Sequence, residues 1–442
     1  MPDNNDTPLV PLPPDDPLRR TLHDEVHARP PARIRMPALV VYVAVLNDGI
    51  TREAECAHLR RLPRQHALPL EAMQGNFLRL RLDGFSVKWE RHTEFTRYSV
   101  VQPLPEGFWA GPDEWPLAGV VAVDVEWLRT IPGRTFAAIE LMMVPHAIDD
   151  AQAVLERARR GFGDRAVVAS LTGGGHACAI TDFRLEPSGF ERMLIVAPPD
   201  TSPTRAGRAS QRLLEIETYR LMALRGLPVA KSLSAMLQQT EDALAAITAR
   251  LEDAAASDRE LLDRLTEIAV RVERATAEHG FRFSATQAYD ALVRQRIAEL
   301  REQPIPGTQT IGEFMQRRLS PAIATVMSTA QRLASLSQRI ERAGALLRTR
   351  VDIATEAQNH ELLAKLTRGQ EMQLRLQSTV EGLSIAAISY YVVSLVLYGA
   401  KAAASAGLRI EPELVAGLSI PIVLFGAWRT VRHIHRKLYQ AS

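Results

Sequence analysis

Two uncharged apolar runs near the end of this 442-residue sequence, at positions 383–400 and 414–428, constrain its fold more than any other feature. A helix of about 20 apolar residues spans the hydrocarbon core of a bilayer, which is roughly 30 Å thick. The second run approaches that length once Thr430 and Val431 are included. Since the residues between the runs can close a loop, the sequence predicts a transmembrane helical hairpin at positions 383–431.

Charges beside the runs predict which side of the membrane the chain faces. The residues after the second run are strongly basic and include Arg429, Arg432, Arg436 and Lys437. In the loop between the runs, basic and acidic residues balance: Lys401, Arg409, Glu411 and Glu413. By the positive-inside rule, the tail at positions 432–442 is cytoplasmic. A hairpin returns the chain to the side it left, so we expect both termini in the cytoplasm.

The rest of the chain has the composition of a soluble protein. Charged residues make up 24% of the chain and hydrophobic ones 46%, so the membrane signal is local. A net charge of +2 does not favour a nucleic-acid partner. Cys56 and Cys178 are too few for a disulfide framework. Residues 1–16 are rich in Pro, Asp and Asn and lack a signal-peptide pattern. We therefore expect a disordered segment at 1–20 and no export of the body.

Positions 21–202 alternate between strand-like and helix-like patterns. Asp83-Gly84, between two alternating runs, is typical of a tight hairpin turn. Helices are predicted at 51–62 and 148–160. Strands are predicted at 38–46, 77–82, 85–91, 93–101, 120–125, 135–144, 166–171, 177–185 and 192–197. This order predicts an α+β domain with a largely antiparallel sheet.

Helical patterns dominate positions 203–382. Helices are predicted at 207–224, 231–250, 258–279 and 285–301, followed by a long helix after Pro321. This last helix has an apolar stripe at mostly three- and four-residue spacing: Leu319, Ile323, Val326, Ala330, Leu333, Ile340, Leu347, Val351 and Ala354. The stripe is coiled-coil-like, and about 60 residues of helix would form a stalk on the order of 90 Å long. Two hypotheses remain: the stripe packs within the chain, or it joins further copies of the chain.

The densest polar cluster lies at positions 22–30. Its candidate site residues are His23, Asp24, Glu25, His27 and Arg29. On a helix His23 and His27 would share one face, an arrangement that suits a divalent metal. The zincin motif needs Glu directly after the first His, whereas Asp24 stands there. We favour a polar helix end that contacts the body and keep metal binding as the alternative.

A second candidate cluster lies at positions 89–95. If these residues form a strand, Glu90, His92 and Glu94 face the same side. They would then form either a site with the first cluster or, as we favour, a surface ladder of charged pairs.

Residues 173–176 read Gly-Gly-Gly-His between two strand-like runs. We interpret them as a hairpin loop rather than a phosphate-binding loop, because no Gly-Lys-Ser/Thr follows. Cys178 is predicted to be a buried structural thiol, since no base can be assigned to it.

Several long stretches are specific enough to compare with known families: 22–30, 89–95, 174–184, 211–220 and 379–391. Together they resemble a bacterial domain-of-unknown-function family of membrane-anchored proteins, over nearly the whole chain. The resemblance implies a C-terminal anchor and supplies no activity. Combined with the charge pattern, it predicts a location in the bacterial inner membrane.

The architecture is also similar to that of CorA-type magnesium transporters, which combine a cytoplasmic α/β body, a stalk helix and two C-terminal membrane helices. The residues that carry this comparison are Tyr398, Gly399, Lys401, Glu411 and Glu413. The defining Gly-Met-Asn is absent, because Gly399 is followed by Ala400 and Lys401. A ring of lysines would repel Mg²⁺ at a pore mouth, so magnesium transport is not implied.

Three functional hypotheses remain open. We favour a membrane-anchored scaffold or regulatory module, whose partners are the bilayer, an unidentified protein and further copies of the chain through the stalk and membrane helices. The alternatives are a CorA-like oligomeric channel with altered selectivity and a membrane-tethered, metal-dependent enzyme. The sequence favours a non-enzymatic role, with no cofactor beyond the metal of the third hypothesis.

Overall fold

The computed structural model describes residues 13, 15–20, 22–23, 32–105, 107–110, 115, 119–253, 256–407 and 411–439, without the side chains of 110 and 432–439. The disorder expected for residues 1–20 falls mainly outside these ranges. The chain divides into two compact units, Met1–Ala255 with Asp263–Glu341, and Ala256–Leu262 with Arg342–Ser442.

The first unit contains a mixed, mostly antiparallel sheet with the strand order β2-β3-β4-β1-β5-β8-β7-β6-β9. The strands are β1 Ala38–Leu46, β2 Phe77–Arg81, β3 Ser86–Arg91, β4 Phe95–Pro103, β5 Arg134–Pro145, β6 Val168–Thr172, β7 Ala177–Leu185, β8 Glu191–Ala197 and β9 Gln303–Pro304. Strands β5 and β8 pair in parallel, whereas β1 pairs antiparallel with both β4 and β5. The α+β fold class predicted from the sequence is confirmed.

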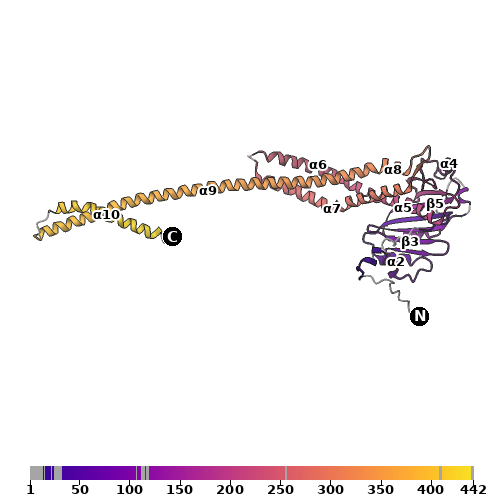
Figure 1. Ribbon diagram of the computed structural model, residues 1–442, viewed down its shortest axis with the longest axis horizontal. Helices are drawn as coiled ribbons and strands as arrows, with labels where there is room; N and C mark the ends of the chain where they lie inside the picture. Colours follow the sequence, from indigo (N-terminus) through magenta and orange to yellow (C-terminus); the bar gives the residue numbers. More distant parts are fainter. Residues whose placement is uncertain are drawn as a thin grey trace, which may run out of the picture. The chain divides into compact units, whose positions relative to one another are not determined.

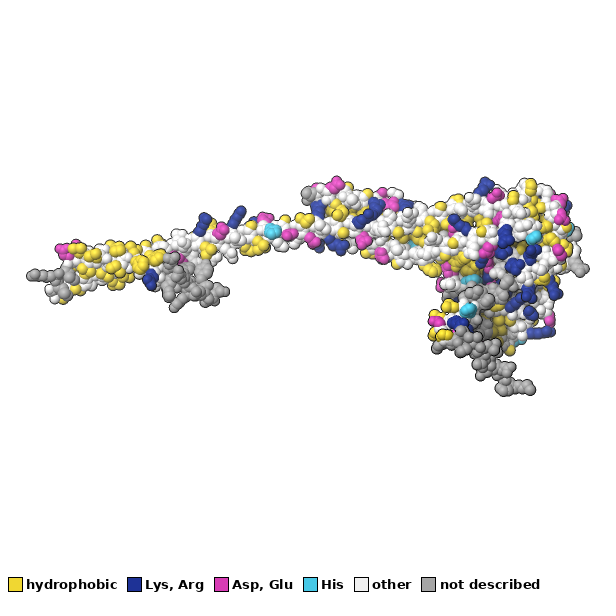
Figure 2. All heavy atoms as spheres, viewed as in Figure 1, with side chains coloured by type: hydrophobic (Ala, Val, Ile, Leu, Met, Phe, Trp, Pro, Cys, Tyr) yellow, Lys and Arg dark blue, Asp and Glu magenta, His cyan; other side chains and the backbone are white. Residues whose placement is uncertain are grey.

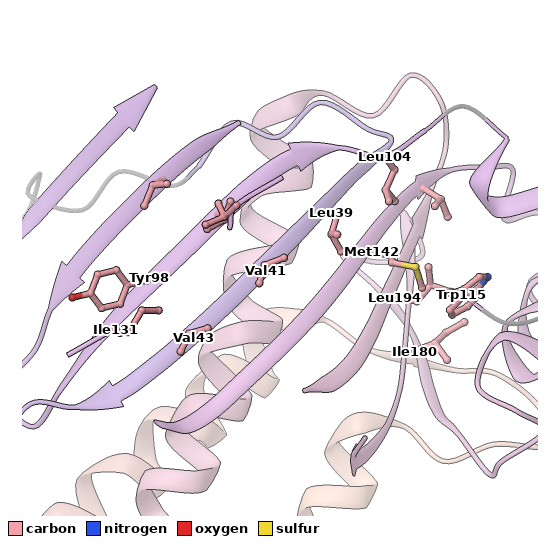
Figure 3. Close-up of a cluster of buried hydrophobic side chains, with 14 of the residues drawn as sticks. Leu39, Val41, Val43, Tyr98, Leu104, Trp115, Ile131, Met142, Ile180 and Leu194 are labelled. Carbon is pink, nitrogen blue, oxygen red and sulfur yellow. The ribbon is translucent and has the colours of Figure 1, made fainter. Parts of the chain in front are cut away.

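Strand β1 lies at the centre of the core. Its run of Val, Leu and Ala suits a strand that is covered on both faces. Leu39, Val41 and Val43 belong to one core cluster (Figure 3), and alternate residues such as Val40 and Tyr42 belong to the other. Burying each such side chain contributes roughly 1.5–3 kcal/mol, so both faces of β1 stabilise the sheet.

Different helices cover the two faces of the sheet (Figure 1). The first face is covered by α2 Arg52–Leu59, α3 Val125–Arg129 and α4 Ala151–Gly161, with the short 3-10 turns η1 Leu70–Met73 and η2 Phe108–Ala110 nearby. The second face is covered by α5 Pro203–Leu224, the C-terminal part of α7 Asp258–Leu300, α8 Ile311–Arg318 and the beginning of α9 Ser320–Ser405. Helix α5 starts where the Ser202 side chain accepts a hydrogen bond from the Arg205 amide.

Within the first unit, α6 Gly226–Arg250 continues the helical part. Arg332 of α9 donates two hydrogen bonds to Glu241 of α6, at 3.1 and 2.8 Å. The Thr286 hydroxyl of α7 donates to the Ala223 carbonyl of α5 at 3.0 Å. Most of the apolar stripe of α9 is buried inside the chain, at positions such as Val326 and Leu333, whereas Val351 and Ala354 are exposed.

The second unit contains the remainder of α9 and α10 Pro412–Tyr439. Each of these helices includes an apolar window long enough to cross a membrane, and only 6% of each window is buried within the chain. Hydrophobic side chains therefore cover much of the surface of the apolar windows, whereas the preceding part of α9 carries many charged side chains (Figure 2). Exposed examples are Leu383, Ile388, Leu395, Leu418, Ile422 and Phe425.

Several local predictions were wrong. Residues 120–125 do not form a strand, because the Gln102 side chain accepts a hydrogen bond from the Ala122 amide and donates to the Val120 carbonyl. Asp124 then caps α3 through the Glu126 amide. The helices predicted at 258–279 and 285–301 are one helix, α7, which continues through Gly280.

Candidate functional site

The first polar cluster lies only partly within the residues that the structure describes. His23 is exposed, and Asp24, Glu25, His27 and Arg29 lie outside the described residues. In the described parts of the chain, no group of three or more His, Cys, Asp and Glu side chains is arranged to hold a metal ion.

The second cluster lies at the end of a hairpin. Strand β3 ends at Arg91 and β4 begins at Phe95, so a turn separates Glu90 from Glu94. The strand alternation expected through position 94 therefore does not hold. Glu90 points into the protein, the His92 ring stacks on Phe95 with centroids 4.5 Å apart, and Glu94 pairs with Arg282. The structure does not bring the three side chains together into one site.

Glu90 belongs to a buried ionic cluster on the α5 side of the sheet. Its carboxylate accepts hydrogen bonds from Arg97 at 2.6 and 2.9 Å and forms an ion pair with Lys88 at 2.9 Å. Burial raises the pKa of the Glu90 carboxyl, but the charges of Arg97 and Lys88 outweigh burial and lower the pKa to about 2. Glu90 is therefore ionised and paired, rather than part of a surface ladder.

The ionic cluster continues through α5 to α7. Arg97 lies 3.5 Å from Glu215 of α5, and Glu215 also pairs with Arg296 of α7 at 2.5 Å. Arg296 in turn pairs with Glu299 at 2.9 Å. Because Glu215 is only 4% exposed, these contacts compensate a carboxylate that burial would otherwise disfavour. We call the chain Lys88, Glu90, Arg97, Glu215, Arg296 and Glu299 the charge network.

One end of the charge network opens into a cavity of about 300 Å³, here called the arginine-rimmed pocket. Its rim carries the polar side chains Arg205, Arg208, Arg212, Arg301, His176 and Glu299. Its floor is formed by buried apolar side chains, namely Ala177, Ile195, Ala197, Ala206 and Leu300. Arg212 pairs with Glu299, with 3.6 Å between Nε and Oε2. The pocket thus combines excess positive charge with an apolar base.

The glycine loop helps to build this pocket. Residues 173–176 connect β6 to β7, which confirms the predicted hairpin loop. The Gly173 amide donates to the Leu300 carbonyl at 2.7 Å, and the Gly174 amide donates to the Arg301 carbonyl at 3.3 Å. Gly173 has φ +65°, a conformation that glycine adopts without strain. Both amides therefore hydrogen-bond to the end of α7 and are not available to bind an anion.

A second buried carboxyl group lies on the same side of the sheet. Burial, together with the neighbouring Glu217 carboxylate, raises the pKa of Glu191 to about 9. Arg220 pairs closely with Glu217 and lies 3.8 Å from Glu191. Glu191 is consequently protonated at neutral pH, so that the two carboxyl groups and Arg220 carry no net charge.

Cys178 is fully buried, and its burial raises the pKa of the thiol to about 12. This confirms the predicted buried thiol and leaves the thiolate needed for nucleophilic chemistry strongly disfavoured.

The residues that carried the transporter comparison lie around the end of α9. Tyr398, Gly399 and Lys401 are all helical, since α9 continues to Ser405. The loop between the two apolar runs therefore starts later than position 401. Glu411 precedes α10 and Glu413 lies in its first turn, and both are exposed. A carboxylate there complements the positive end of the helix dipole, which accounts for Glu413 without an ion.

The arginine-rimmed pocket was missed by reasoning from the sequence. Arg205, Arg208 and Arg212 recur at three- and four-residue spacing in α5, a pattern that could have indicated a basic helix face. Arg301 and His176 join that face only through tertiary folding, because they follow α7 and end the glycine loop.

The fold defines a class of proteins in which an α+β body with a mostly antiparallel sheet precedes long helices, the last of them apolar enough to cross a membrane. The chain belongs to the family described as Protein of unknown function (DUF3422), whose model matches residues 14–438. No curated protein matches the chain. The architectural similarity to CorA-type transporters therefore stays a hypothesis.

Proposed function

We propose that this chain is a membrane-anchored scaffold or regulatory module, held at the cytoplasmic face of the bacterial inner membrane by its C-terminal hairpin. The observation that carries the proposal is the exposure of both apolar windows, of which only 6% is buried within the chain. An apolar core helix of a soluble protein would be mostly buried. A bilayer would cover this surface and remove its exposed side chains from water.

The charge pattern supports the proposed orientation. Arg429 and the basic residues at positions 432–437 follow the second window, and retention of basic residues in the cytoplasm is the usual outcome. The α+β unit would then lie on the same side as the tail, because the two spans form a hairpin. No catalytic role is assigned to the body, where the buried Glu90 and Glu215 carboxylates are held in ion pairs.

Membrane extraction tests the anchor. The full chain should stay in the membrane pellet after washing with alkaline carbonate, whereas the double variant Leu395→Arg, Ile422→Arg should be released. Each arginine at a helix centre costs about 2.5–3.5 kcal/mol of insertion free energy. Leu362→Arg is the matched control, since Leu362 is 58% exposed in α9 outside both windows. Release of the unmodified chain by carbonate would overturn the anchor.

Topology and assembly need separate measurements. Reporters fused before Met1 and after Ser442 should both be active only in the cytoplasm; an external C-terminal reporter would overturn the orientation. A scaffold or regulatory module can have any oligomeric state in mild detergent. It should give no ion flux when reconstituted in proteoliposomes. A stable pentamer that conducts ions, with flux altered by Lys401→Asn, would favour the channel hypothesis instead.

A further inference from the structure

We propose that the arginine-rimmed pocket binds a small, soluble organic phosphate, with the phosphate at the rim and the organic part on the floor. The cavity of about 300 Å³ has the size of a small ligand site. A site of this size suits a monophosphate that carries one small ring or a short carbon chain. This inference does not depend on the membrane anchor.

The rim of the pocket carries excess positive charge. Arg205, Arg208 and Arg301 are exposed, and within the described ranges none of the three forms an ion pair. Glu299 is the acidic side chain in the lining, and it already contacts both Arg212 and Arg296. A dianion would balance two of these three positive charges. Guanidinium groups match phosphate oxygens in charge and in bidentate geometry, so phosphate is the favoured anion.

The floor of the pocket selects for an organic phosphate. Ala197 and Ala206 are each 2% exposed, and Leu300 is 3% exposed. Their small or aliphatic side chains have no hydrogen-bonding groups for a hydrated ion. An apolar ligand group placed on them would lose contact with water, which favours binding in proportion to the area buried. An inorganic anion would leave this part of the pocket unused.

A phosphate bound in the pocket would contact residues from two helices, α5 and α7. Arg208 lies on α5, whereas Arg301 directly follows α7. One phosphate that contacts both would join these two helices, which the charge network already connects through Glu215 and Arg296. Ligand binding should therefore stabilise the first unit, because a ligand that binds only the native state raises its stability by mass action.

Calorimetric titration of the full chain in uncharged detergent tests the proposal. Phenyl phosphate is the main probe, with phenol and inorganic phosphate as its two halves and dihexanoyl phosphatidic acid as a lipid headgroup. The pocket variant is Arg208→Gln with Arg301→Gln. Arg225→Gln is the matched control, since Arg225 is exposed at the end of α5 and does not line the pocket. Ala209→Leu fills the pocket without changing its charge.

We expect saturable binding of one phenyl phosphate per chain, at least about tenfold weaker in the pocket variant and unchanged in the control. Phenol should not bind, and Ala209→Leu should weaken phenyl phosphate more than inorganic phosphate. Thermal melts without ligand should match the unmodified chain, which separates lost binding from lost folding. Absence of saturable binding, an equal loss in the control, equal affinity for inorganic phosphate, or binding of the lipid alone would each overturn the proposal.

Discussion

Replacing Arg97 with Met should strongly destabilise the first unit, because it removes the central cation of the charge network. Arg97 is 3% exposed and contacts the carboxylates of both Glu90 and Glu215. Methionine retains most of the side-chain length, so the substitution chiefly deletes charge and hydrogen bonds. The two carboxylates would then remain buried with fewer partners, which is the situation that makes a broken buried ion pair costly.

The pKa of Glu90 gives the size of the expected loss in the free energy of unfolding. Arg97 and Lys88 together bring this pKa from its ordinary value of 4.5 to about 2, against the opposing effect of burial. At about 1.4 kcal/mol per pKa unit, the ionised carboxylate gains roughly 3 kcal/mol of stabilisation on folding. Since Glu90 is buried, solvent screening does not reduce this figure greatly. We expect Arg97→Met to lower the free energy of unfolding by about 3 kcal/mol near neutral pH.

The pH dependence makes this prediction specific. Because the pKa of Glu90 is depressed in the native chain, its contribution is present above about 4.5 and lost as the pH falls through about 2. In the variant, the carboxyl accepts a proton more readily, so the deficit should be smaller at pH 4.5 than at pH 7.5. Breaking only packing contacts would give the same deficit at both values.

Urea unfolding in detergent, followed by tryptophan fluorescence, measures the loss. Trp89, next to Glu90, is buried together with Trp115 and Trp127, so the fluorescence reports on unfolding of the first unit. Arg81→Met is the matched control, since Arg81 is exposed on β2. A loss below about 1 kcal/mol at pH 7.5, or a deficit that does not change with pH, would refute this account of the charge network.

Two further substitutions test neighbouring features. Glu191→Gln should remove a fall in stability of about 4 kcal/mol between pH 5.5 and 8.5, because native Glu191, with its pKa raised to about 9, holds a proton that the unfolded chain releases. If the stability of the variant and of the unmodified chain changed with pH in the same way in urea unfolding, this account would be contradicted. Gly207→Ala should lower the free energy of unfolding by roughly 1–3 kcal/mol, because its Cβ would lie 1.5 Å from the Ala32 carbonyl oxygen. Gly280→Ala, whose Cβ meets nothing within 4 Å, should instead stabilise α7 by about 1 kcal/mol in the same assay, and equal losses would refute the steric argument.

Much of the fold could be predicted from local patterns. Strand β1 was predicted with its observed bounds because its unbroken apolar run has few alternatives in a chain of this composition. Residues 120–125 were mistaken for a strand, since their valines resemble one and the competing partner, Gln102, is distant in sequence. The short strand β9 was missed because it consists of Gln303 and Pro304, which pair with β6 only after the end of α7 is in place.

The candidate site was far less predictable. Glu90 and Glu94 were grouped by strand alternation, but a turn at positions 92–94 sends one into the charge network and the other to Arg282. The prediction that nearby residues of this segment form one site was therefore wrong. The arginine-rimmed pocket instead combines one helical repeat of arginines with Arg301 and His176, which are brought in from separate elements. No local rule of spacing connects those positions.

The buried polar residues of α5 fix the position of the helix on the sheet and need no catalytic role. Within ten residues it supplies Glu215 to the charge network, Glu217 to the carboxyl pair and Thr218 to the Tyr42 hydroxyl at 2.7 Å. Each polar group has a partner on the sheet, so a rotation or a shift of the helix would leave buried charges unpaired. Such groups contribute little net stability, but they disfavour other positions of the helix. The same helix carries Arg205 and Arg208, which line the arginine-rimmed pocket. A helix held in one position would keep these two residues close together before an anion binds, which lowers the cost of binding.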